Sequence, residues 1–263
     1  MSIAVFDSGM GGLTVLHEAM RRLPGEDFIY YADTLHVPYG TKPKDVVKEC
    51  VLAAARRIME QPERVRAIVV ACNTATSIAI QDLRATYDIP IIGMEPAVKP
   101  AVEISRRIGR RVLVTATPLT LRESKYHELV NRVDDQAIVD SLPLPELVRY
   151  CEALQFEGEE IERYFREKLA GRRLEEYGTI VLGCTHFPFY RGTLRKLLPP
   201  HIRIIDGSEG TVRRLLEVAG VPDANKQGSL RFLSSDGDEK YVLKLKTALG
   251  LYQEMTRGEE ERG

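Results

Sequence analysis

Short apolar runs rich in β-branched residues recur along this chain, and segments with helical periodicity separate them. The runs cover residues 2–6, 27–33, 67–72, 89–94, 111–116, 137–142, 179–184 and 202–206. The helical segments place apolar residues three to four positions apart, with basic residues toward their C-terminal ends. This alternation predicts an α/β fold on mainly parallel sheets. Within the Glu- and Arg-rich segment 144–169, Gly158 is expected to separate two helices.

Two of the apolar runs end in similar segments, RAIVVACNTATS with Cys72 and TIVLGCTHFPF with Cys184. Their separation of 112 residues (184 − 72) is close to the size of a small domain, so we expect two pseudo-symmetric α/β domains. The stretch IIGMEPAVKPA is the expected crossover, IIDGSEGTVRRLLE the expected return, and LRFLSSD a final strand of the first half. The first domain would then comprise residues 1–97 and 208–263 and the second residues 98–207, with the active site in the cleft between them.

Composition excludes several classes of protein. The 263 residues carry a net charge of −1, so the overall charge does not favour binding to nucleic acid or to an anionic membrane. The N-terminus lacks the pattern of a signal peptide, and no run approaches the roughly 18 apolar residues of a spanning helix. The four cysteines include no C-x-x-C pair, which favours a reducing cytoplasm. Cys50 and Cys151 fall at apolar positions of helical segments and are assigned to packing.

The two matched cysteines are the strongest candidates for chemistry. Cys72 precedes Asn73, Thr74 and a predicted helix, whose N-terminus can lower the pKa of a thiol from ~8.5 to roughly 3.5–7.5. Cys184 is followed by Thr185 and then by an acid/base group, His186. A single such cysteine is more often a small core residue, but the repetition of the pattern weakens that interpretation. Two thiols in matched settings suit a reaction that works from both faces of one carbon, such as racemisation.

Two loops are expected on the same rim. In FDSGMGG, Asp7 and Ser8 end the first strand, and the glycines that follow could present backbone amides to a carboxylate. The alternative is a tight turn with Asp7 as a helix cap. In TLHVPYG, Tyr39 and Gly40 could also bind a carboxylate, or form only a turn with an aromatic plug.

Other uses of these side chains remain open. Zinc could be held by Cys72, Cys184, His186 and Asp7, although the two-residue spacing of Cys184 and His186 differs from the usual zinc signatures. A single-thiol hydrolase could use Cys184 with His186, which would leave Cys72 without a role. A disulfide between the two cysteines is disfavoured in the cytosol.

The segments FDSGMGGLTVL, ADTLHVPYG, ACNTATS and LGCTHFP occur in this order, and over about residues 3–210 the chain resembles the glutamate racemases, cofactor-independent members of the aspartate/glutamate racemase superfamily. The resemblance implies racemisation of L- and D-glutamate, supplying D-glutamate for peptidoglycan, in a cleft between two α/β domains. It implies a thiolate/thiol pair at Cys72 and Cys184 on opposite faces of the substrate α-carbon, with Asp7 supporting the first and His186 the second. The implied substrate contacts are Asp7, Ser8, Tyr39, Gly40, Asn73, Thr74, Thr117, Thr185 and His186. We also expect no cofactor, no metal and a homodimer.

Two features depart from the family pattern. The family often has Gly-Thr-x-Gly-Thr after the fifth strand, whereas TATPLT keeps Thr117 and Thr120 but loses both glycines, so this loop is expected to sit differently. The family often has a glutamate after a Leu-Val pair where LPELVRY has Arg149, a charge reversal expected near the cleft. The alternative functions are a racemase of another acidic amino acid such as aspartate, a single-cysteine hydrolase or decarboxylase, and a non-catalytic amino-acid-binding module.

Overall fold

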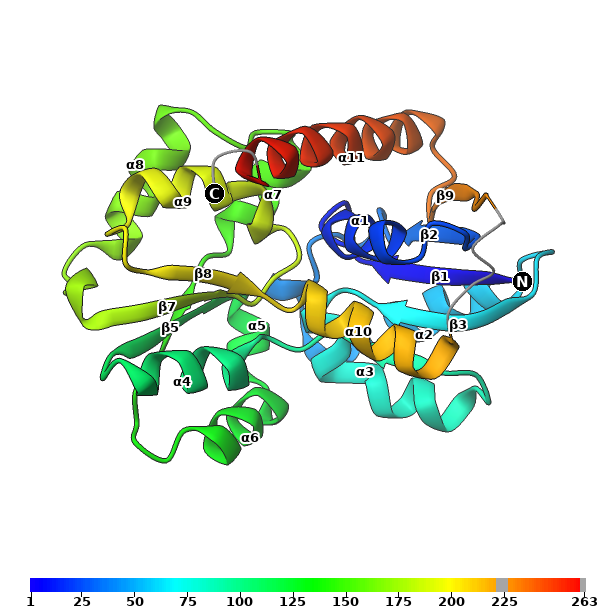
Figure 1. The fold of residues 1–263 in the computed structure, drawn as a ribbon. Helices are drawn as coiled ribbons and strands as arrows, with labels where there is room; N and C mark the ends of the chain where they lie inside the picture. Colours follow the sequence, from blue (N-terminus) through cyan, green and yellow to red (C-terminus); the bar gives the residue numbers. More distant parts are fainter. Residues whose placement is uncertain (221–226, 261–263) are drawn as a thin grey trace.

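Two β-sheets carry the fold, and every strand pair in them is parallel (Figure 1). The computed structural model describes residues 1–220 and 227–260. The first sheet has the order β4-β3-β1-β2-β9 and consists of β1 (Ser2–Asp7), β2 (Phe28–Ala32), β3 (Val65–Val70), β4 (Ile91–Gly93) and β9 (Leu230–Ser234). The second has the order β6-β5-β7-β8 and consists of β5 (Arg111–Ala116), β6 (Val139–Pro143), β7 (Tyr177–Leu182) and β8 (Arg203–Asp206). The predicted α/β class is therefore confirmed.

The two sheets repeat one arrangement. The order β4-β3-β1-β2 corresponds to β8-β7-β5-β6, so β3 and β7 occupy equivalent places beside β1 and β5. Both pairs shift register at their first residues, between Ser2 and Ile3 in β1 and between Arg111 and Val112 in β5. This repetition confirms the predicted pseudo-symmetry. It also places Cys72 and Cys184, which follow β3 and β7, at equivalent points of the two sheets.

Helices cover both faces of the first sheet. Alternate strand residues such as Phe6 and Val70 pack against α2 (Lys44–Met59) and α3 (Asn73–Thr86). Residues between them, such as Val5, pack on the opposite face. That face is covered by α1 (Leu13–Arg22), α10 (Ser208–Ala219) and α11 (Glu239–Glu260). Burial on both faces explains why these strands are continuous apolar runs rather than alternating ones.

The second sheet is also covered on both faces. Val114 and Val181 pack with α4 (Val98–Arg107) and α6 (Ser124–Val133). The opposite face is covered by α7 (Glu146–Glu152), α8 (Glu159–Leu169) and α9 (Arg191–Leu197). The short elements are α5 (Pro118–Arg122), η1 (Tyr39–Thr41), η2 (Leu174–Glu176) and η3 (Phe187–Tyr190). The predicted split of segment 144–169 is confirmed, with Gly158 at φ 116° before α8.

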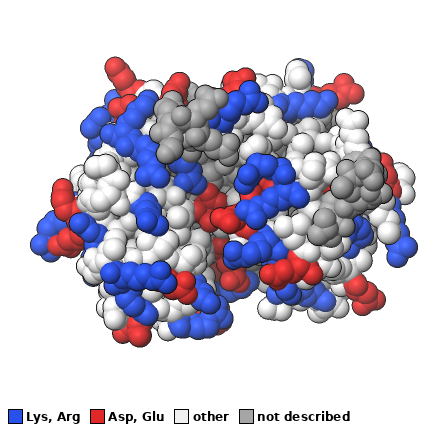
Figure 2. Space-filling view, viewed as in Figure 1, with Lys and Arg blue, Asp and Glu red and all other residues white. Residues whose placement is uncertain are grey.

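One core joins the two halves, because buried side chains of both sheets belong to the same cluster as α1, α7 and α11. As predicted, the segment LRFLSSD returns to the first sheet, where β9 pairs with β2. The predicted domain boundaries at 97/98 and 207/208 fall between the strands of the two sheets, and they stay a prediction. Lys and Arg are interspersed with Asp and Glu over the face shown in Figure 2. No helix in residues 1–220 or 227–260 combines the length and apolar character needed to cross a bilayer.

Helix α11 offers a matched test of this shared core, because Leu245 is 0% exposed and Leu243 is 65% exposed. Leu245→Ala should destabilise the protein by about 2–5 kcal/mol through lost burial and a cavity. Leu243→Ala should stay within about 0.5 kcal/mol. The midpoint of urea-induced unfolding, followed by circular dichroism, measures both, and equal shifts would contradict the described packing of α11.

Candidate active site

The carboxyl ends of β1, β3 and β7 bring the candidate residues of both halves together. Cys72 is the N-cap of α3, and Cys184 lies in the turn between β7 and η3. Each cysteine is only 6% exposed. The Thr185 hydroxyl donates to Asp7 Oδ2 at 3.0 Å, so a residue beside the second thiol is bonded directly to the end of the first strand.

The DSGMGG loop binds carboxylates of the protein itself. The Gly9 amide donates to Asp7 Oδ1 at 3.0 Å, and the Met10 amide donates to Glu152 Oε1 at 2.9 Å. Helix α1 begins after Gly12 without a side-chain cap, so the alternative of Asp7 as a helix cap is wrong. A Cβ at Gly9 would lie 2.0 Å from Glu152 Oε1, and one at Gly11 would lie 2.3 Å from His186 Nδ1. Only glycine allows this loop to approach the second half so closely.

A chain of polar contacts supports Cys184. His186 Nδ1 lies 3.7 Å from the Cys184 sulfur, and Nε2 lies 2.7 Å from Glu152 Oε1. The second Glu152 oxygen, Oε2, accepts the Tyr241 hydroxyl at 2.5 Å. Helix α7 supplies Glu152 and helix α11 supplies Tyr241, so three separate segments build this side of the site.

The pKa values of this group favour an imidazolium between two partners. Burial alone would lower the pKa of His186, but hydrogen bonds and charge from Cys184 and Glu152 raise it well above its usual value. Burial would raise the pKa of Glu152, but hydrogen bonds from His186, Tyr241 and the Met10 amide lower it overall. The raised pKa of His186 favours its protonated form, in which both ring nitrogens are donors.

The surroundings of Cys72 are different. Its sulfur accepts the Ala75 amide at 3.4 Å, and its thiol lies 3.9 Å from Ser8 Oγ, which in turn lies 3.5 Å from Asp7 Oδ1. Burial, then the charge of Asp7, raises the pKa of Cys72, and the amide at the start of α3 offsets this only in part. The predicted lowering of this pKa by the helix N-terminus is therefore wrong, because loss of solvation outweighs the helix dipole. Burial likewise raises the pKa of Asp7.

Three threonine hydroxyls form a cluster at the other edge of the site. Thr74 Oγ1 lies 3.0 Å from the hydroxyl oxygens of Thr117 and Thr120, which lie 2.9 Å from each other. Thr117 is the N-cap of α5 and accepts the Thr120 amide. The TATPLT loop therefore uses a hydroxyl cap in place of glycines and holds Thr117 against Thr74.

Tyr39 and Gly40 reach this edge through η1. A Cβ on Gly40 would lie 2.4 Å from the Thr117 Cβ, so the absence of a side chain allows η1 to touch α5. The Tyr39 side chain is 1% exposed, and its hydroxyl donates to Asp33 Oδ2 at 2.5 Å. This hydroxyl is thus fixed by a carboxylate that the sequence interpretation did not include.

Asn73 differs from its neighbours in lacking a protein partner. Its side chain is 3% exposed, and neither Nδ2 nor Oδ1 has a hydrogen-bond partner within the described residues. An unpaired buried polar group costs about 1–3 kcal/mol. A ligand that offers both a donor and an acceptor would remove that cost, which suits an amino acid.

The remaining sequence expectations have mixed outcomes. Arg149 does not face the site, because its side chain is 72% exposed and pairs with Glu146 at 2.5 Å. Cys50 and Cys151 are buried in the cores, as predicted, and all four thiols are free, so the disulfide between Cys72 and Cys184 is absent. In the described residues, Cys72, Cys184, His186 and Asp7 do not gather their donor atoms into a metal-binding group.

The sequence interpretation missed Glu152 and Tyr241. Glu152 lies four residues after the buried Val148 and directly after the buried Cys151, so a carboxylate continues the apolar stripe of α7. A charge on a buried helix face was the signal that could have identified Glu152. Tyr241 had no comparable signal, because only the packing of α11 brings it to the site.

Comparison with known proteins gives consistent matches. Residues 13–215 match the model of the Asp/Glu/Hydantoin racemase family. A relative named glutamate racemase from Halothermothrix orenii is 52% identical over 93% of this chain and 96% of its own. A glutamate racemase from Escherichia coli, solved with L-glutamate and the activator UDP-MurNAc-Ala, is similar with TM-score 0.80 and 30% identity over 94% of this chain and 95% of that chain. A glutamate racemase from Francisella tularensis, solved with D-glutamate, has TM-score 0.79 and 29% identity over 95% of this chain and 93% of that chain.

The protonation of His186 can be tested with Glu152→Gln and, as a matched control on the exposed face of α7, Glu146→Gln. Removing the Glu152 charge should lower the pKa of His186, measured by nitrogen NMR of labelled histidine, whereas the control should leave it unchanged. Because the folded pKa is raised, stabilisation from this pair is complete below the ordinary histidine pKa of about 6.5 and is lost as pH rises through the folded value. An unchanged His186 titration in Glu152→Gln would contradict the assignment.

Proposed function

The chain belongs to the Asp/Glu/Hydantoin racemase family, and on this premise we propose that it interconverts L- and D-glutamate without a cofactor. The substrate assignment is supported by relatives named glutamate racemase and by related structures that hold L-glutamate or D-glutamate. The observation that carries the proposal is the pair of buried thiols at equivalent ends of two repeated sheets, each with different polar helpers.

We propose that one thiolate removes the α-proton while the opposite thiol donates a proton to the other face of the carbon. Exchange of the two roles runs the reaction in reverse. On the Cys184 side, His186 Nδ1 lies 3.7 Å from the sulfur, close enough to exchange a proton with it. On the Cys72 side, burial and Asp7 favour the thiol. Cys72 would therefore begin as the proton donor, and a two-base reaction then requires Cys184 to begin as the base.

For the opposite direction, Cys72 has to become the thiolate. The contacts Cys72–Ser8 and Ser8–Asp7 provide a route along which its proton can move toward Asp7. Asp7 suits this part because burial raises the pKa of its carboxyl group. A protonated Asp7 would also no longer oppose the negative charge on Cys72.

Acid/base chemistry alone supplies about 10²–10⁴-fold acceleration, which is too little for a weakly acidic α-carbon. Hydrogen-bond donors aimed at the substrate carboxylates in a site that excludes water would supply more. We propose that the substrate is contacted by the rim residues Ser8, Tyr39, Gly40, Asn73, Thr74, Thr117 and Thr185, together with Asp7 and His186. The Tyr39 and Thr185 hydroxyls already donate to Asp33 and Asp7. Donation to the substrate carboxylates therefore falls first on a donor with no protein partner in the described part of the chain, the Asn73 amide. The unpartnered amide of Asn73 is the clearest support.

We further propose that the D-glutamate serves peptidoglycan synthesis and that the enzyme works in the cytoplasm as a homodimer. Four free thiols fit a reducing compartment.

Exchange in deuterated water tests substrate and mechanism together. Each enantiomer of glutamate should incorporate deuterium at the α-carbon and lose optical rotation. Cys72→Ser and Cys184→Ser should each abolish racemisation from both enantiomers, whereas Cys151→Ala should retain it. Exchange with aspartate but not glutamate would identify the alternative acidic substrate, and turnover after loss of Cys72 would favour a single-thiol hydrolase or decarboxylase.

Tyr241→Phe tests the support of Glu152 from α11. Loss of the hydroxyl removes a hydrogen bond to a charged group, worth about 1.5–3 kcal/mol, so kcat should fall roughly 10-fold or more and its pH profile should shift. Tyr150→Phe is the matched control, because its hydroxyl meets only the exposed Glu160 at 3.0 Å. A fall in kcat with an unchanged pH profile would contradict a positioning role for Tyr241.

A further inference from the structure

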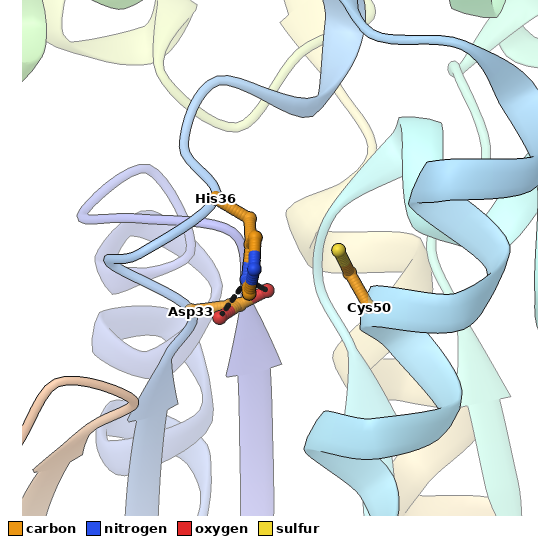
Figure 3. A group of neighbouring side chains, drawn as sticks. All are labelled: Asp33, His36 and Cys50. Carbon is orange, nitrogen blue, oxygen red and sulfur yellow. Dashed lines mark hydrogen bonds and ion pairs between the residues drawn. The ribbon is translucent and has the colours of Figure 1, made fainter.

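A carboxylate, an imidazole and a thiol lie together beside the candidate active site. Asp33 follows β2, His36 lies three residues farther along the same loop, and Cys50 projects from α2 toward them (Figure 3). One donor atom from each lies within 4.8 Å of the other two. His36 Nδ1 is 2.9 Å from both oxygens of Asp33. We propose that Asp33, His36 and Cys50 form a binding site for a divalent cation of the zinc class.

The set of donors selects this class of metal. Zinc and cobalt accept carboxylate, imidazole and thiolate together, whereas magnesium and calcium require oxygen ligands. Three protein ligands leave a fourth tetrahedral position for water or a small molecule. In residues 1–220 and 227–260, this is the one such group of three donor atoms.

The geometry needs only a small adjustment. Zinc bonds of about 2.0–2.3 Å at tetrahedral angles place neighbouring donor atoms roughly 3.5 Å apart, compared with a limit of 4.8 Å here. His36 can supply this movement, because its side chain is 44% exposed on a loop, while that of Asp33 is 4% exposed. The exposed imidazole also gives the ion a route from solvent. The buried Cys50 and Asp33 give it a partly dry site.

An outer contact connects this site to the substrate rim. Asp33 Oδ2 accepts a hydrogen bond from the Tyr39 hydroxyl at 2.5 Å. Outer-sphere hydrogen bonds of this kind commonly orient a carboxylate that ligates a metal. The backbone amide of Asp33 also donates to the Asp7 carbonyl at 3.0 Å. A cation that binds Asp33 would withdraw charge from its contact with Tyr39 and should raise the KM for substrate. This kinetic effect rests on the proposed function, whereas binding of the metal does not.

Cobalt binding tests the site directly. In the variant Cys72→Ser/Cys151→Ala/Cys184→Ser, Cys50 is the only remaining thiol of the four. Titration with Co²⁺ should give one thiolate-to-cobalt charge-transfer band per chain, which Zn²⁺ should displace. Adding Cys50→Ala should abolish the band. Adding His36→Ala should weaken binding at least about tenfold, a loss seen even for outer-sphere changes. His127→Ala, at an exposed histidine, should leave binding unchanged.

Single variants test the site even if the triple variant does not fold. By equilibrium dialysis, Cys50→Ala and His36→Ala in the otherwise intact chain should each bind one Zn²⁺ fewer than wild type. One equivalent of Zn²⁺ should raise the KM of the wild type but not that of His36→Ala. Absence of the charge-transfer band with Cys50 present, or its persistence after Cys50→Ala, would overturn the proposal. Equal zinc binding by wild type and both single variants would also overturn it, since the ion would then occupy only the catalytic thiols.

Discussion

The close approach of the DSGMGG loop to the second half is the contact on which the site depends. It brings Met10 within hydrogen-bonding distance of Glu152 and allows Thr185 to bond to Asp7. A side chain at Gly9 or Gly11 would overlap Glu152 or His186, so the loop needs glycine for space, while its Gly9 and Met10 amides bind the carboxylates of Asp7 and Glu152. Without this approach, the residues that follow β1 and those that follow β7 would lose the contacts Met10–Glu152 and Thr185–Asp7.

The internal repeat makes the backbones of the two halves similar, but the side chains around the two thiols differ. Equivalent strands deliver Cys72 and Cys184 to equivalent places. The first thiol then lies near Ser8, Asp7 and a helix N-terminus, whereas the second lies near the imidazole of His186. Desolvation raises the pKa of Cys72, while contacts with Cys184 and Glu152 raise the pKa of His186. A nearly symmetric scaffold therefore presents two different protonation environments.

Much of the site could be found from local sequence because parallel strands end at one edge of a sheet. That rule located Asp7, Cys72 and Cys184 without knowledge of the packing. The rule does not tell whether burial or the helix dipole has the larger effect on the pKa of a thiol, and the predicted low pKa of Cys72 was wrong. The family pattern, by contrast, led us to expect Arg149 near the cleft, although the rotation of α7 turns that side chain to solvent and brings Glu152 inward.

The sequence by itself determined the α/β class, the repeat, the return of β9 and the two thiols, because apolar periodicity and strand-end position are local properties. Only the tertiary structure decided which polar groups serve each thiol. Glu152 and Tyr241 come from helices far from Cys184 in sequence, and Asp33, His36 and Cys50 meet only when α2 packs beside the loop after β2. Charge and hydrogen-bonding depend on distances of a few ångströms across such contacts, and those distances are set by packing rather than by neighbours in the chain.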